Sequence, residues 1–197
     1  RSSGYCSNSD AQQDGCNAWA AMSSFANTAA NGSVTADAEL NTYLNGTYKD
    51  SLSDKAYIAE NMTWNVGHAG VYNDTKSVSE LENMEKAYTC TGDIALATKS
   101  EYIRAHGNSS CSNAKYLYDN YQNDTCKTTN YLFKSNYWYW LLSPYSTSAH
   151  TVSGAYSGYV NSFSAYYQGG SVRPVLYLKS NITLSGNGGQ ASADMIA

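Results

Sequence analysis

A long stretch without any charged side chain, from Ser135 to Val172, constrains this sequence more than any other feature. Of the 28 charged residues (12 basic and 16 acidic), 25 precede the stretch and three follow it. Near its start lies the run Tyr137–Leu142, which is mostly aromatic, and aromatic residues are typical of strands. Pro144 cannot donate a hydrogen bond to a strand partner, so we expect the strand to end at Ser143-Pro144. The stretch therefore predicts a strand that crosses the core, followed by an uncharged polar segment.

The segments after this strand also have strand character. We expect further strands around Gly158–Asn161 and from Val172 to Leu178, with a turn at Gly169-Gly170. Antiparallel hairpins are the simplest arrangement of strands that follow one another so closely.

The first part of the chain has the pattern of helices. Apolar residues recur at helical spacing between Trp19 and Ala29. A second helix is expected from Thr35 to a stop signal at Asn45-Gly46, and a third after Ser53-Asp54.

Shorter elements are expected in the middle of the chain. Asp93 to Thr98 has the character of a short strand, and Ser100 is a candidate cap for a brief helix. The region from His106 to Thr129 is expected to be a cross-linked loop.

These patterns predict an α+β fold, in which helices come first and a small, twisted antiparallel sheet with long loops follows. A length of 197 residues suits one compact domain with an additional N-terminal element. We expect a helical extension over residues 1–34 and a single domain over residues 35–197.

The five cysteines lie in polar contexts and form no C-x-x-C pair, which favours disulfides over zinc or redox chemistry. Cys6 with Cys16 and Cys111 with Cys126 would each close a short loop and leave Cys90 over, although other pairings remain open. The alternative is a cytoplasmic protein with five reduced thiols, but scarce lysine and 19 tyrosines weigh against it. An extracellular or cell-surface location is therefore expected.

The sequence lacks the residues that are characteristic of several functional classes. A net charge of −4 argues against nucleic acid as a partner, and no apolar run reaches the length of a membrane span. His68, His106 and His150 are far apart and lack metal-ligand spacing. Neither a G-x-S-x-G motif nor a phosphate-binding glycine loop occurs. We expect no enzyme, no bound metal and no cofactor.

The segment between Pro144 and Arg173 is rich in Tyr, Ser, Gly and Asn. Tyrosine supplies rigid amphipathic contacts at low entropic cost, and the small polar residues supply adaptable hydrogen bonds, as in antibody loops. The alternative is an ordinary hairpin whose tyrosines line the faces of a sheet. The absence of charge across the whole segment favours a binding surface.

Two ordered motifs resemble a known family. Trp140-Leu141-Leu142-Ser143-Pro144 and, further on, Val172-Arg173-Pro174-Val175-Leu176-Tyr177-Leu178-Lys179-Ser180 are similar to a C-type-lectin-like module of bacterial surface and pilin-like proteins. The module is related to the variable proteins of diversity-generating retroelements and to the formylglycine-generating enzymes. The likeness covers roughly residues 35–190 and implies a C-type-lectin-like fold over the domain at 35–197.

The resemblance also implies roles for individual residues. The scaffold would consist of Trp140, Ser143, Pro144, Arg173 and Pro174. Adenine-directed mutation of asparagine codons in retroelement systems yields a restricted set of residue types, and these types occur at the positions that would form the ligand-binding surface: Tyr145, Thr147, Ala149, His150, Ala155, Tyr156, Tyr159, Asn161, Phe163, Ala165, Tyr166 and Tyr167.

The sequence also departs from these families. The Glu-Pro-Asn and Gln-Pro-Asp motifs of calcium-dependent lectins are absent, so calcium is not expected. No cysteine follows Cys126, whereas the formylglycine-generating enzymes use cysteines late in the chain.

The resulting hypothesis is an exported or surface-displayed binding protein of the adhesin or receptor type. Its partner would be a protein or glycan on another cell or surface. The alternative is a pilin-like structural subunit whose tyrosine-rich face packs against neighbouring subunits in a homo-oligomer or filament.

Overall fold

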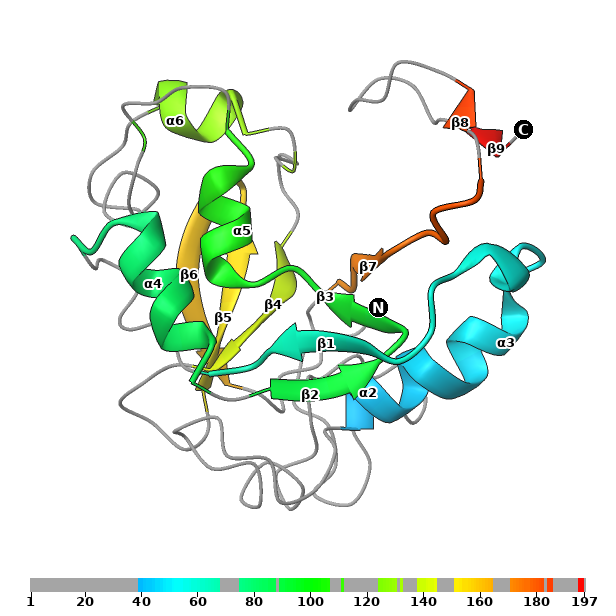
Figure 1. Cartoon of the computed structure of the whole chain (residues 1–197). Coiled ribbons are helices and arrows are strands. Elements are labelled where there is room, and N and C mark those ends of the chain that lie inside the picture. Colours follow the sequence, from blue (N-terminus) through cyan, green and yellow to red (C-terminus); the bar gives the residue numbers. More distant parts are fainter. Residues whose placement is uncertain are drawn as a thin grey trace.

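A computed structural model describes residues 39–67, 75–87, 89–106, 111, 124–130, 132, 138–144, 151–164, 171–182, 184–185 and 195–196. These residues form short helices and small antiparallel sheets, which confirms the α+β class (Figure 1). The extension expected over residues 1–34, with Cys6 and Cys16, lies outside the described residues.

The first described helix continues past its expected end. α2 (Glu39–Tyr43) leads into a π-helical turn, η2 (Leu44–Tyr48), and then into α3 (Lys49–Ser51). The stop expected at Asn45-Gly46 is therefore wrong. Gly46 has no positive φ, and the Asn45 side chain is engaged by a strand instead of capping the helix.

The helix expected after Ser53-Asp54 is a single 3-10 turn, η3 (Lys55–Tyr57). It is short because Ile58 leaves the helical conformation and pairs with Leu178 in an antiparallel bridge.

Two small antiparallel pairs of strands follow. β1 (Met62–Asn65) pairs with β2 (Thr89–Gly92), and the expected strand β3 (Ile94–Leu96) pairs with β7 (Pro174–Leu176). β3 and β7 confirm the strands expected in these regions, although β7 is shorter than Val172 to Leu178. β1 and β2 were not predicted from the sequence.

Two helices carry complete N-terminal capping boxes. In α4 (Val78–Glu85) the Ser77 hydroxyl accepts from the backbone of Glu80, whose carboxylate in turn accepts from the backbone of Ser77. In α5 (Lys99–Arg104) the same exchange joins Thr98 and Glu101. The brief helix is confirmed, but its cap is Thr98 and not Ser100.

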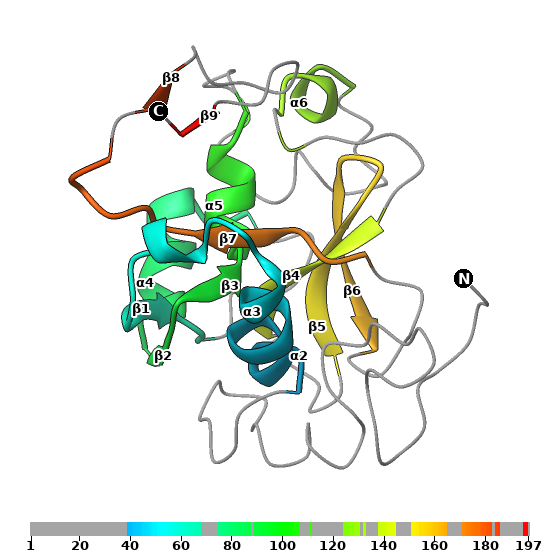
Figure 2. The ribbon, with the colours of Figure 1, turned by 90° about the vertical axis from the view of Figure 1, so that its right-hand side faces the viewer.

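The largest sheet contains β4 (Trp138–Pro144), β5 (Thr151–Tyr156) and β6 (Tyr159–Ser164), in the antiparallel order β4-β5-β6 (Figures 1 and 2). The aromatic strand is thereby confirmed. Pro144 is the last residue of β4 and pairs with Val152. The register between β4 and β5 shifts between Trp140 and Pro144.

This sheet separates two clusters of buried side chains. On one side Trp140 and Val152 pack with Leu40, Leu44 and other residues of the helical segment, β1 and β3. On the other side Tyr139, Leu141, Ala155 and Val160 pack against α4 and α5. The sheet is therefore the wall that both halves of the core share.

The expected cross-link between Cys111 and Cys126 is present, with the two Cα atoms 5.5 Å apart. Both cysteines are fully buried, and Cys126 belongs to α6 (Asp124–Thr128). Near the C-terminus β8 (Leu184–Ser185) pairs with β9 (Met195–Ile196). Among the helices of the described residues, none has the length and apolar character needed to cross a membrane.

Candidate ligand-binding face

The register of the β4-β5-β6 sheet gathers four of the expected surface residues on one face. Tyr156 lies opposite Tyr159, and Gly154 and Val152 lie opposite Asn161 and Phe163. Because directly opposed residues share a face and alternate residues along a strand point the same way, the four side chains extend from the same side. We call Trp138, Tyr156, Tyr159, Asn161 and Phe163 the hairpin face.

Trp138 was not among the residues expected at the site. It lies directly opposite Tyr156, so the pairing adds an indole to the hairpin face. Its position in the uncharged aromatic run was visible in the sequence, but its partner strand was not, because β5 was not predicted.

The turn that joins β5 to β6 places two tyrosines at its ends. Ser157 and Gly158 both have positive φ, 44° and 87°, as the tight two-residue turns of hairpins require. Tyr156 is 46% exposed and Tyr159 is half-buried. The end of the hairpin therefore presents phenol rings to solvent.

Further along the face, aromatic rings pack on one another. Phe163 stacks on Trp138 at 4.6 Å between centroids, and Trp138 meets Trp140 edge-on at 4.7 Å. Gly154 makes this possible, because a Cβ at that position would come within 2.7 Å of the Phe163 ring. Phe163 is thus half-buried and forms the floor of the hairpin face.

Ala155 does not belong to this face. It is 1% exposed and points to the opposite side of the sheet, where it lies opposite Val160 in the cluster around α5. The alternation of side chains along β5 separates it from Tyr156, so its assignment to the binding surface is wrong.

The remaining seven expected surface residues lie outside the described residues: Tyr145, Thr147, Ala149, His150, Ala165, Tyr166 and Tyr167.

Three residues expected to be scaffold are buried: Trp140, Ser143 and Pro144. Trp140 is 1% exposed within the core, and Ser143 is fully buried. The Ser143 hydroxyl accepts from the backbone N–H of Lys99 at 2.9 Å and donates to the Glu85 carboxylate at 2.6 Å. Ser143 therefore anchors the end of β4 to α4 and α5.

Glu85 is the acceptor at the centre of this junction. Its carboxylate, 1% exposed, also accepts from the backbone N–H of Ser100 at 3.1 Å and from the Ser100 hydroxyl. Burial raises the pKa of Glu85, although the serine hydrogen bonds partly counteract it. The group is a structural one, since it lies behind the sheet, away from the hairpin face.

Arg173 supports the sheet from the same side as Tyr139. Its guanidinium lies over the Tyr139 ring at 5.0 Å and donates to the carbonyl of Leu132. Burial raises the pKa of Tyr139. This contact agrees with a scaffold role for Arg173, although its side chain is exposed.

The electrostatics of the hairpin face are those of neutral polar groups. No residue of β5 or β6 carries a formal charge, and the Asn161 carboxamide oxygen accepts from the backbone N–H of Ser162. In the part of the chain that the structure describes, no three His, Cys, Asp or Glu side chains gather where they could hold a metal ion. The face can offer ring stacking and hydrogen bonds from hydroxyl and amide groups.

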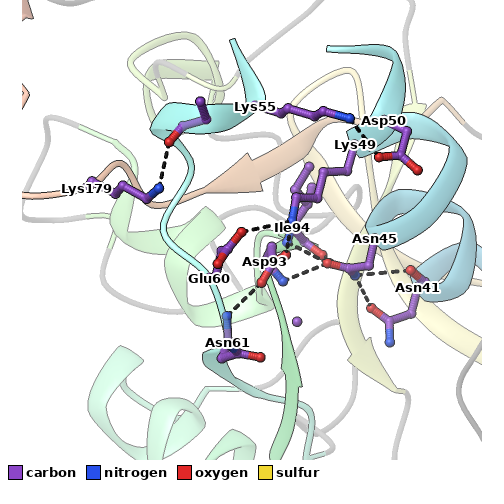
Figure 3. A network of polar contacts seen from close by, with 12 residues as sticks. Asn41, Asn45, Lys49, Asp50, Lys55, Glu60, Asn61, Asp93, Ile94 and Lys179 are labelled. Carbon is purple, nitrogen blue, oxygen red and sulfur yellow. Dashed lines mark hydrogen bonds and ion pairs between the residues drawn. The ribbon is translucent and has the colours of Figure 1, made fainter. Parts of the chain in front are cut away.

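A separate polar network joins the helical segment to β3 (Figure 3). The Asn45 carboxamide accepts from the backbone N–H groups of Asp93 and Ile94 at 2.6 and 2.9 Å, and it donates to the carbonyl of Ile94 at 2.9 Å. Lys49 forms an ion pair with Asp93 at 2.6 Å, which raises the pKa of Lys49 and lowers the pKa of Asp93. All of these groups satisfy one another, so the network is structural.

A family model described as "Domain of unknown function (DUF6273)" matches residues 22–180, and the chain belongs to this family. The match includes the whole hairpin face. No curated protein and no solved structure matches the chain.

Proposed function

We propose that this chain is an exported or surface-displayed ligand-binding protein whose C-type-lectin-like domain uses the hairpin face as its contact surface. The observation that carries the proposal is the register of β5 and β6, which aligns Tyr156, Tyr159 and Asn161 beside Trp138. Three of these residues are of the types that antibody loops favour. The neutral character of the face supports binding rather than catalysis.

The rigidity of the support agrees with this proposal. The Trp138–Phe163 stack lies beneath the exposed end of the hairpin, and β5 is held on both edges by neighbouring strands. A preorganised surface loses less conformational entropy when a ligand binds. A protein or a glycan on another cell or surface fits such a face, with Tyr156 as its most exposed aromatic group.

The most direct experiment uses the purified chain on arrays of glycans and of surface proteins. The double variant Tyr156→Ala/Tyr159→Ala should lose at least about tenfold in affinity for any partner that the wild type binds, since tyrosines that a bound partner covers are common hot spots. Tyr43→Ala is the matched control, because Tyr43 is 40% exposed but lies on α2. Equal losses for the two variants would refute the assignment.

The retroelement hypothesis has its own test. Sequencing of the coding region across a population should find variation at Tyr156, Tyr159 and Asn161, and constancy at the buried Ala155 and Val160. A uniform region would instead favour a fixed adhesin.

The pilin-like alternative predicts a different result in solution. If the hairpin face packs on neighbouring subunits, the wild type would assemble with rising concentration, and Tyr156→Ala/Tyr159→Ala would remain monomeric in analytical ultracentrifugation.

A further inference from the structure

A second aromatic surface lies where the chain near η3 meets the segment after β7. The bridge between Ile58 and Leu178 is flanked by two backbone hydrogen bonds, from Ala59 N–H to Tyr177 O at 2.8 Å and from Lys179 N–H to Tyr57 O at 2.9 Å. Tyr57 is thus opposite Lys179, and Ala59 is opposite Tyr177. Tyr57, Tyr177 and Lys179 are exposed, whereas Ile58 at the centre of the bridge is buried.

Both tyrosines are open to solvent. Tyr57 is 40% exposed and Tyr177 is 46% exposed. They are diagonal neighbours across the bridge, a separation of roughly 7–8 Å between backbones that aromatic side chains can span. We call these two exposed rings, which lie on adjacent backbone segments, the platform.

The Tyr177 ring is held in place from behind. It stacks on Trp64 with 5.1 Å between centroids and 25° between planes. Trp64 is 3% exposed and donates its indole N–H to the Gly92 carbonyl at 2.8 Å. Because one side of the Tyr177 ring is covered by a fixed indole, the exposed area belongs to its other side and its edge.

A positive charge lies beside the platform. The Lys179 ammonium donates to the Ala56 carbonyl at 2.7 Å, and among the described residues no carboxylate pairs with it (Figure 3). The neighbouring lysines differ, since Lys55 pairs with Asp50 and Lys49 pairs with Asp93 and Glu60. Lys179 therefore retains ammonium protons with which to bind an anion.

We propose that Tyr57, Tyr177 and Lys179 form a binding site for a carboxylated polysaccharide, in which a sugar ring stacks on the tyrosines and its carboxylate pairs with Lys179. The apolar C–H side of a sugar ring fits a flat aromatic ring, and the phenol hydroxyls supply hydrogen bonds to its edge. A single ammonium group matches a chain with one carboxylate per sugar better than a densely sulfated chain. This site is separate from the hairpin face and does not depend on its function.

Binding of the full chain to polygalacturonate, measured by biolayer interferometry, tests the proposal. Lys179→Gln keeps a donor for the Ala56 carbonyl but removes the charge, and it should weaken binding at least about tenfold, as loss of a charge-assisted contact does. Lys86→Gln removes the same charge from the end of α4 and should leave binding within about twofold. Tyr57→Ala should weaken binding by a similar factor to Lys179→Gln, without a change in melting temperature.

Other polymers define the results that would overturn the site. Neutral dextran should not bind, and heparin should bind more weakly than polygalacturonate. The site is refuted if heparin binds as tightly as polygalacturonate or more tightly. Equal losses for Lys179→Gln and Lys86→Gln would also refute it, and so would a Tyr57→Ala variant with full affinity. Tyr156→Ala/Tyr159→Ala should bind polygalacturonate as the wild type does, which separates this site from the hairpin face.

Discussion

Asn45 ties the helical segment to β3 through side-chain hydrogen bonds. Its carboxamide accepts from the backbone N–H groups of Asp93 and Ile94 and donates to the carbonyl of Ile94, which is fully buried. Asn45→Ala would leave these groups unsatisfied, so we predict a loss of about 2 to 4 kcal/mol in the free energy of unfolding. Urea denaturation measures it, with the exposed Thr47→Ala as the control. A loss as small as that of Thr47→Ala would contradict the role of Asn45.

Glu85 makes stability depend on pH in a direction unusual for a carboxylate. Burial raises its pKa in the folded protein above the ordinary value of 4.5. The protonated form is therefore favoured by folding, and its contribution is present below the unfolded pKa and lost as the pH rises through the folded pKa. We predict that the stability of Glu85→Gln, which cannot ionise, increases relative to that of the wild type as the pH rises above 4.5.

Glu82 supplies the matched control on the same helix. Lys86 and Arg104 lower its pKa, so its contribution is present at neutral pH and lost as the pH falls. Urea denaturation of Glu82→Gln across the same pH range should show the opposite trend. Parallel curves for the two variants would rule out the assignment for Glu85.

Substitutions of two glycines by alanine are expected to change the free energy of unfolding in opposite directions. Gly154→Ala would force the Phe163 ring away from Trp138, because the added Cβ would approach it within 2.7 Å. We expect a loss of about 1 to 3 kcal/mol in the free energy of unfolding and a shift in tryptophan fluorescence. Gly46→Ala meets no atom within 4 Å in its helical turn and should stabilise by about 0.5 to 1 kcal/mol. Equal effects in denaturation would argue against the packing at β5.

The segment around α6 depends on its cross-link. Cys111 and Cys126 are separated by 15 positions and both are fully buried. We predict that the double substitution Cys111→Ser/Cys126→Ser lowers the free energy of unfolding by about 3 kcal/mol. The wild type in reducing agent should lose a similar amount, and a melting temperature unchanged by reduction would contradict this.

Elements with strong local signals could be predicted from sequence, and elements that depend on distant partners could not. β4 is evident from its aromatic run and α5 from its apolar residues, although the cap expected at Ser100 is Thr98. β1 was not, because Met62–Asn65 acquires its strand conformation through pairing with β2. For the same reason the tyrosines were expected as a group, but Ala155 could be separated from Tyr156 only once the register of β5 was known.

Both faces of the β4-β5-β6 sheet pack against a buried cluster. β5 and β6 present Ala155 and Val160 to the core beside α5, whereas Tyr156, Tyr159 and Asn161 lie on the side of Trp140 and Val152 and remain at least partly exposed. We expect Tyr156, Tyr159 and Asn161 to be largely dispensable for folding, whereas Phe163 also stabilises the fold through its contact with Trp138.

A mutational scan of residues 151–164 on displayed protein, read out as resistance to protease, tests this claim most directly. We predict that Tyr156, Tyr159 and Asn161 accept most substitutions and retain protease resistance, whereas the buried Val152, Ala155 and Val160 do not. If Tyr156 and Tyr159 prove as intolerant as Ala155 and Val160, these tyrosines belong to the core and the hairpin face is not a binding surface.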